Sequence, residues 1–191
     1  EFVISQAKQS GKTILFAGAD HYIYMLPKIF YDLNDCRIAV AVKSEVWKKN
    51  LSNLFPRGRI MLEKEIFHDE ELYDYIFFFE KDSLKMVPLL KGHLFENAKM
   101  NVVLPYTLIM DTAVREQEIK RTIAKEKSLA GYYDFPFEND EFGLLEIIKG
   151  NSGPVTFGEA VIKDGILQKT KLFDGASSRF KCSRCGHGKA D

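Results

Sequence analysis

The sequence lacks an excess of charge of either sign. Its 191 residues carry 27 Lys and Arg against 27 Asp and Glu, a formal net charge of +0. A neutral chain has no overall electrostatic field to attract polyanions or anionic lipids. We therefore expect neither nucleic acid nor a membrane as its partner.

Long hydrophobic runs are also missing. The apolar stretches, such as residues 75–79 and 102–106, are far shorter than the roughly 20 residues that cross a bilayer. The first residues do not have the pattern of a signal peptide. Only three cysteines are present, which disfavours a disulfide framework. We predict a cytoplasmic protein with reduced thiols.

Several catalytic signatures are absent. The sequence contains no Gly-x-Gly-x-x-Gly fingerprint, Gly-x-Ser-x-Gly elbow, His-Glu-x-x-His motif or Walker A loop. Its acidic clusters at 69–71 and 140–141 lie in polar stretches, without an apolar pocket to raise a carboxyl pKa. The common hydrolase, nucleotidase and dinucleotide-binding classes are thereby disfavoured.

The composition and length suit one domain with a substantial core. Apolar residues make up 46% of the chain and aromatic residues 13%. We divide the chain into a polar leader over residues 1–11, an α/β domain over 12–150, and a hairpin with a cysteine-containing tail over 151–191. The glycines at 150 and 153 mark the second boundary as a turn.

Short apolar runs alternate with amphipathic segments along the α/β domain. Strands are predicted over residues 12–18, 37–42, 59–62, 73–79, 100–106 and 132–135. Helices are predicted over residues 20–33, 44–55, 82–91, 111–129 and 140–149, with Asp20 and Ser44 as the N-caps of the first two. This alternation favours a three-layer Rossmann- or flavodoxin-like parallel sheet. Asp164-Gly165 between apolar runs predicts an additional C-terminal β-hairpin.

The candidate binding residues follow from the geometry of such sheets, in which ligands bind beyond the carboxyl ends of the strands. Helix N-termini at that edge favour anions, so a phosphate is the expected group. Asp20 would repel an anion unless its carboxylate turns away or is neutralised. The candidate residues are Gly18, Ala19, Asp20, Ser44, Ser83, Pro105, Tyr106 and Thr107.

His21 is the candidate catalytic residue. It follows the first strand, where an imidazole is placed to transfer a proton or to contact a ring or phosphate. The alternative is a structural hydrogen-bonding role or a simply exposed side chain.

A Cys-x-x-Cys pair near the end of the chain resembles one half of a zinc ribbon. Cys182 and Cys185 would supply two thiolates, and His187 is a candidate third ligand. A fourth ligand would come from Cys36, another subunit or further residues. The alternatives are a reduced tail without metal or a redox-active dithiol, and the dithiol is disfavoured because no helix N-terminus lies beside the pair.

Residues 12 to about 136 resemble the flavoprotein family of homo-oligomeric flavin-containing cysteine decarboxylases and flavin prenyltransferases. The resemblance rests on Thr-Ile-Leu-Phe-Ala-Gly at 13–18, the aromatic run at 73–79 with its helix ending at Gly92, Asn-Val-Val-Leu-Pro-Tyr-Thr-Leu-Ile-Met at 101–110, and Leu-Ala-Gly at 129–131. It implies a homo-oligomer that binds FMN or a related phosphorylated ligand at the strand ends.

Two functions follow from this resemblance and from the tail. The first is an oxidoreductase or decarboxylase-type role on a small-molecule ligand. The alternative is a non-catalytic binding or assembly module, with metal-linked oligomerisation through the Cys-x-x-Cys tail.

Overall fold

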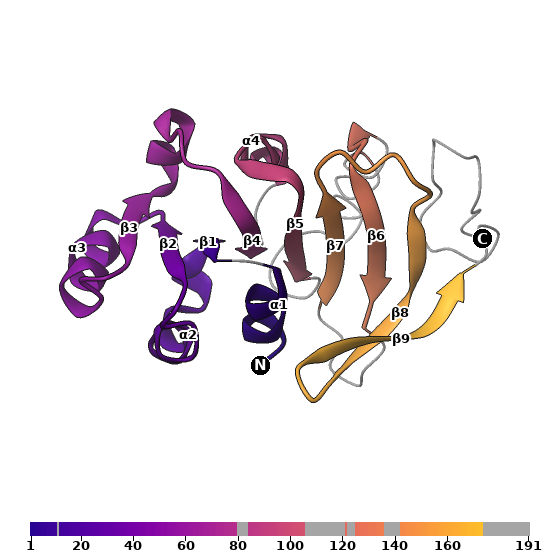
Figure 1. Cartoon of the computed structure of the whole chain (residues 1–191), viewed down its shortest axis with the longest axis horizontal. Helices are drawn as coiled ribbons and strands as arrows, with labels where there is room; N and C mark the ends of the chain where they lie inside the picture. The colour runs from indigo at the N-terminus through magenta and orange to yellow at the C-terminus, as the bar shows by residue number, and fades with distance from the viewer. Residues whose placement is uncertain (11, 80–83, 106–120, 122–124, 136–141, 174–191) are drawn as a thin grey trace.

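The computed structural model describes residues 1–10, 12–79, 84–105, 121, 125–135 and 142–173, and their strands form one nine-stranded sheet (Figure 1). The strands are β1 (Thr13–Ala17), β2 (Arg37–Val42), β3 (Arg59–Leu62), β4 (Tyr73–Phe79), β5 (Leu94–Pro105), β6 (Leu129–Asp134), β7 (Phe142–Ile148), β8 (Thr156–Lys163) and β9 (Ile166–Phe173). The α-helices are α1 (Phe2–Ser10), α2 (Leu26–Asp32), α3 (Glu45–Leu54) and α4 (Val87–Gly92). Four 3-10 helices accompany them: η1 (Ala19–His21), η2 (Ile23–Met25), η3 (Glu63–His68) and η4 (Leu84–Met86).

The strand order is β3-β2-β1-β4-β5-β7-β6-β8-β9. The first five strands in this order are parallel, as expected. Their arrangement is that of the Rossmann sheet and differs from the flavodoxin-like order, in which the third strand neighbours the first. The predicted parallel sheet is confirmed for these five strands but not for the sheet as a whole, because β7 runs antiparallel to both β5 and β6.

Strand β7 occupies a segment for which the sequence predicted a helix. Its apolar residues Leu144, Leu145, Ile147 and Ile148 have the spacing of a helical face, yet the same pattern suits a strand that is covered on both sides. Leu144, Leu145 and Ile147 are all buried, which means that both faces of the strand are covered. Pairing along β5, with Val102 opposite Leu145, decides between the two structures.

The sheet separates two hydrophobic layers. Ile14 and Phe16 of β1 face a core formed with α1, α2 and α3. Leu15 and Ala17 face the opposite core, to which η3, η4 and α4 contribute. This alternation follows from the period of two in a strand and gives the predicted three-layer arrangement.

Helix α1 lies within residues 1–11, which the sequence analysis treated as a leader. Phe2, Ile4 and Ala7 are buried: Ile4 and Ala7, three residues apart on one face of the helix, pack in the core beneath α1 and α2, and Phe2 packs in a separate cluster. Phe2 packs with Tyr133 and other residues of the strands β6, β7 and β8. The segment is therefore part of the core.

The C-terminal hairpin is confirmed. Asp164 and Gly165 connect β8 to β9 with positive φ angles of 53° and 74°, as a two-residue type I′ turn requires. Strand β8 also pairs in parallel with β6, so the hairpin continues the main sheet.

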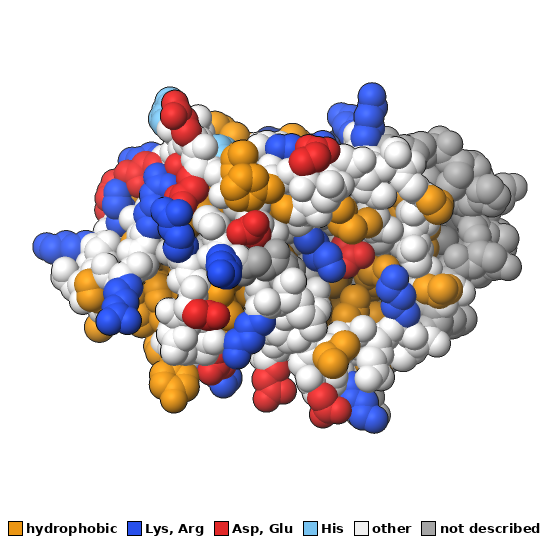
Figure 2. Space-filling model, in the orientation of Figure 1, with side chains coloured by type: hydrophobic (Ala, Val, Ile, Leu, Met, Phe, Trp, Pro, Cys, Tyr) orange, Lys and Arg blue, Asp and Glu red, His pale blue; other side chains and the backbone are white. Residues whose placement is uncertain are grey.

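Basic and acidic side chains are interspersed over the face of the molecule seen in Figure 2, in agreement with the zero net charge. Among the helices of the described residues, none combines the length and the apolar character needed to cross a membrane.

Candidate functional site

The turn after β1 is pressed against the end of β4. Gly18 has a φ of 68°, in the left-handed region, and a β-carbon at this position would overlap the carbonyl oxygen of Phe79. Only glycine combines this backbone conformation with such a close approach. The carboxyl ends of β1 and β4 are therefore fixed relative to each other at the point where the strand order reverses.

Asp20 links the same turn to β2. Its Oδ2 atom accepts a hydrogen bond of 2.7 Å from the backbone N–H of Lys43, which directly follows β2. The prediction that Asp20 caps a helix over residues 20–33 is wrong. Two 3-10 turns, η1 and η2, come first, and α2 begins at Leu26 with Pro27 in its first turn. The carboxylate thus joins two strand ends.

Aromatic rings line the junction of β1 and β4. The His21 and Phe79 rings lie 5.4 Å apart, and the Tyr22 ring meets Phe77 and Phe79 edge-on at 5.3 and 6.1 Å. Tyr22 is buried, and its hydroxyl donates a hydrogen bond to the carbonyl of Ala17. The phenol ring is fixed by these contacts.

Two carboxylates give this edge an anionic character. Burial raises the pKa of Tyr22 well above its ordinary value, and electrostatic repulsion from Tyr75, Glu63 and Asp20 raises it further. Tyr22 therefore stays protonated at neutral pH. Glu63 is the first residue of η3 and directly follows β3, so carboxylates from two strand ends act on one phenol.

The structure describes six of the predicted site residues at the carboxyl edge: Gly18, Ala19, Asp20, His21, Ser44 and Pro105. Ser44 is the predicted N-cap of α3, and its hydroxyl accepts from the N–H of Trp47 at 3.5 Å. Pro105 is the last residue of β5. Ser83, Tyr106 and Thr107 lie outside the described residues.

Glu63 and the ring of Phe79 were missed as site residues. Residues 63–72 lie between the predicted strands over 59–62 and 73–79, and none of them was among the candidate site residues. Glu63 follows a strand immediately, so the rule that selects strand ends was a sufficient signal. Phe79 was assigned only to the interior of the sheet.

The predicted metal ligands Cys182, Cys185 and His187 lie outside the described residues. Within the described ranges, no group of three or more His, Cys, Asp or Glu side chains is arranged to hold a metal ion. The Cys36 thiol donates a hydrogen bond to Asp35 Oδ1 at 3.5 Å, and burial, followed by the nearby Asp35, raises its pKa.

The fold resembles that of methyltransferases of known structure. A Listeria monocytogenes protein described as a class I S-adenosylmethionine-dependent methyltransferase aligns with a TM-score of 0.56 at 8% identity, over 82% of this chain and 62% of that one. A predicted O-methyltransferase of Agrobacterium tumefaciens aligns with a TM-score of 0.57 at 10% identity, over 83% of this chain and 84% of that one. The ribosomal protein L11 methylase of Lactobacillus delbrueckii subsp. bulgaricus aligns with a TM-score of 0.54 at 14% identity, over 76% of this chain and 74% of that one. The sequence matches no protein-family model and no curated protein.

These structures overturn the resemblance to flavin-containing decarboxylases, and with it FMN as cofactor and the oxidoreductase or decarboxylase role. The quoted segments, an apolar strand ending in glycine and an aromatic central strand, are features of parallel sheets in general. Zinc is likewise not supported, because the structural neighbours are described as methyltransferases, one of them as S-adenosylmethionine-dependent, and the described residues contain no metal cluster. The alternative of a metal-linked assembly module gains no support either. At 8 to 14% identity, the likeness establishes a Rossmann-like fold for this chain.

Proposed function

We propose that this chain is a methyltransferase that binds S-adenosylmethionine at the carboxyl edge of β1, β2 and β3. The observation that carries the proposal is the pair of carboxylates, Asp20 and Glu63, near Tyr22 at this edge. The likeness to S-adenosylmethionine-dependent enzymes supports it.

The residues at this edge suit the chemical groups of the cofactor. Ribose hydroxyls donate hydrogen bonds to carboxylates, as at the strand ends of other Rossmann folds. Asp20 uses Oδ2 for Lys43, while its Oδ1 forms no hydrogen bond with a described residue. A positively charged sulfonium is stabilised by carboxylates and by aromatic faces such as that of Phe79. The same charges would repel the phosphate of FMN.

The bound cofactor would supply an activated methyl group. In this proposal, Asp20 and Glu63 bind and orient the nucleoside, and the rings of Tyr22 and Phe79 exclude water beside it. His21 is the candidate to take a proton from the methyl acceptor, since its ring lies on Phe79 at this edge. Because the chain has no net charge, we propose a small molecule as the acceptor.

Isothermal titration calorimetry with S-adenosylmethionine tests the proposal. We expect saturable binding to the unmodified chain, and a dissociation constant about tenfold higher in Asp20→Asn, because a hydrogen bond to a charged group is lost. The amide oxygen of Asn can still accept from Lys43, so the turn is retained. Glu63→Gln should weaken binding to a similar extent.

Glu70→Gln is the matched control, since Glu70 is an exposed carboxylate in the connection that precedes β4. It should bind S-adenosylmethionine as the unmodified chain does. Absence of binding to folded unmodified protein would contradict the proposal. Equal binding by all four proteins would remove Asp20 and Glu63 from the site.

A further inference from the structure

Two adjoining hollows lie at the amino ends of β1, β2 and β3, on the edge of the sheet opposite to Asp20 and Glu63. Their volumes are about 260 and 240 Å³. Cys36, Ile38 and Arg57 line both of them, so the two hollows adjoin. Each volume is close to the lower end of the range for small-ligand pockets, about 300 Å³.

The first hollow is mainly apolar. The rings of Phe30 and Phe55 stack at 4.3 Å with an interplanar angle of 5°, which gives a rigid wall. Leu33, Leu54 and Pro56 complete the apolar lining. The Leu54 residue is 68% exposed, so this apolar surface is open to a ligand.

The second hollow is cationic. Arg37, Arg57 and Arg59 line it together with a single carboxylate, that of Glu71. Among the described residues, Arg37 forms one ion pair, at 3.7 Å with Glu71, and its side chain is 81% exposed. Arg57 is exposed and forms no ion pair with any residue in the described ranges.

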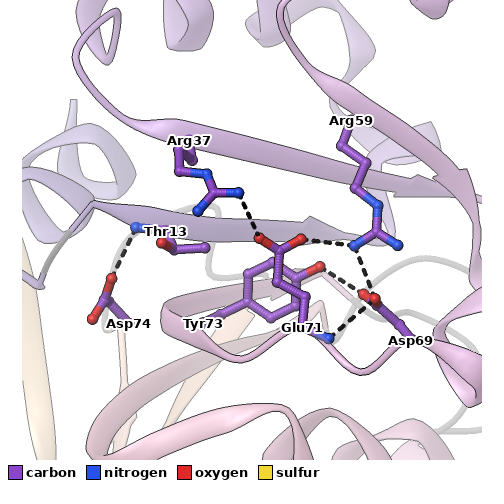
Figure 3. A network of polar contacts seen from close by, with 7 residues as sticks. All are labelled: Thr13, Arg37, Arg59, Asp69, Glu71, Tyr73 and Asp74. Carbon is purple, nitrogen blue, oxygen red and sulfur yellow. Dashed lines mark hydrogen bonds and ion pairs between the residues drawn. The ribbon is translucent and has the colours of Figure 1, made fainter.

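A polar network fixes the floor of this second hollow (Figure 3). One guanidinium nitrogen of Arg59 donates to Asp69 at 2.8 Å and to Glu71 at 2.7 Å. The Tyr73 hydroxyl donates to Asp69 at 2.8 Å, and the Asp69 side chain is only 4% exposed. Arg59 is thereby held in place, and Arg37 and Arg57 are left to meet a ligand.

We propose that these two adjoining hollows bind a small amphipathic organic anion, with its apolar part against Phe30, Leu54 and Phe55 and its anionic group between Arg37 and Arg57. Guanidinium groups suit carboxylates, phosphates and sulfonates through paired hydrogen bonds. The site is separate from the proposed cofactor site, since the two occupy opposite ends of the same parallel strands.

Fluorescence titration with anilinonaphthalene sulfonate, an aromatic anion, tests the proposal. We expect saturable binding, with an affinity about tenfold lower in Arg57→Gln and lower still in Arg37→Gln/Arg57→Gln, since each change removes a charged partner. Leu54→Gln should also weaken binding. All three variants change exposed side chains, so their thermal unfolding midpoints should match that of the unmodified chain. Lys163→Gln on the distant hairpin is the control and should bind normally.

Competition separates the proposed site from general hydrophobic binding. Octanoate should displace the probe at a much lower concentration than octanol, which has the same chain length and no charge. In a Cys182→Ser/Cys185→Ser background, octanoate should also slow maleimide labelling of Cys36, which lies between the hollows. Equal displacement by the two compounds, or unchanged affinity in the double arginine variant, would overturn the proposal.

Discussion

Replacing Gly18 with alanine is expected to lower the free energy of unfolding by more than about 3 kcal/mol. The added methyl group would overlap the carbonyl oxygen of Phe79, and the φ of 68° is itself unfavourable for alanine. Neither conflict is relieved by a side-chain rotation, because both involve the backbone. Urea unfolding followed by circular dichroism measures the loss.

Gly92→Ala is the matched control for this substitution. Gly92 ends α4, and a β-carbon there would meet no heavy atom within 4 Å. We expect a change of no more than about 0.5 kcal/mol, as for other exposed substitutions. Comparable stability of the two variants would mean that the turn after β1 is not pressed against β4.

The strands were predictable where local chemistry and the fold agree. The aromatic run of β4 has too many consecutive apolar residues for a half-exposed strand, so only a central position suits it. Asp164-Gly165 and Ser44 likewise have roles that their residue types determine locally. For β7 the local pattern suits two structures, and pairing with β5 decides.

The site was harder to predict because its contacts are long-range. Gly18 is recognisable as a turn residue, but its close approach to Phe79 joins strands far apart in sequence. The bond from Lys43 to Asp20 spans 23 residues and turns an expected helix cap into a link between strand ends. The position of Glu63 at a strand end could be inferred from the sequence. Its effect on the pKa of Tyr22 could not, because that effect depends on the packing of η1 and η3 around β2. The spacing of the residues predicts which edge of the sheet holds the site. Which charged side chains meet at that edge depends on the tertiary structure.

Asp69→Asn is expected to destabilise the protein by about 2 kcal/mol at neutral pH. Burial opposes ionisation of Asp69, but hydrogen bonds from Tyr73, Arg59 and the N–H of Glu71 outweigh it and lower its pKa. The amide of Asn presents an N–H₂ group to donors and carries no charge for Arg59. The buried network would therefore lose part of its hydrogen bonding.

The effect of this substitution should depend on pH in a definite direction. Because the pKa of Asp69 is lower in the folded state, its contribution to stability is complete above its unfolded pKa of about 3.9 and is lost as the pH falls through the folded value. The stability difference between unmodified and Asp69→Asn protein should accordingly be constant from neutral pH to about pH 5 and shrink below about pH 4. Asp164→Asn, at an exposed turn position that Asn tolerates, should show no such difference at any pH. A stability difference between the two proteins that stays constant below pH 4, or that increases on acidification, would contradict an ionised Asp69 as the centre of the network.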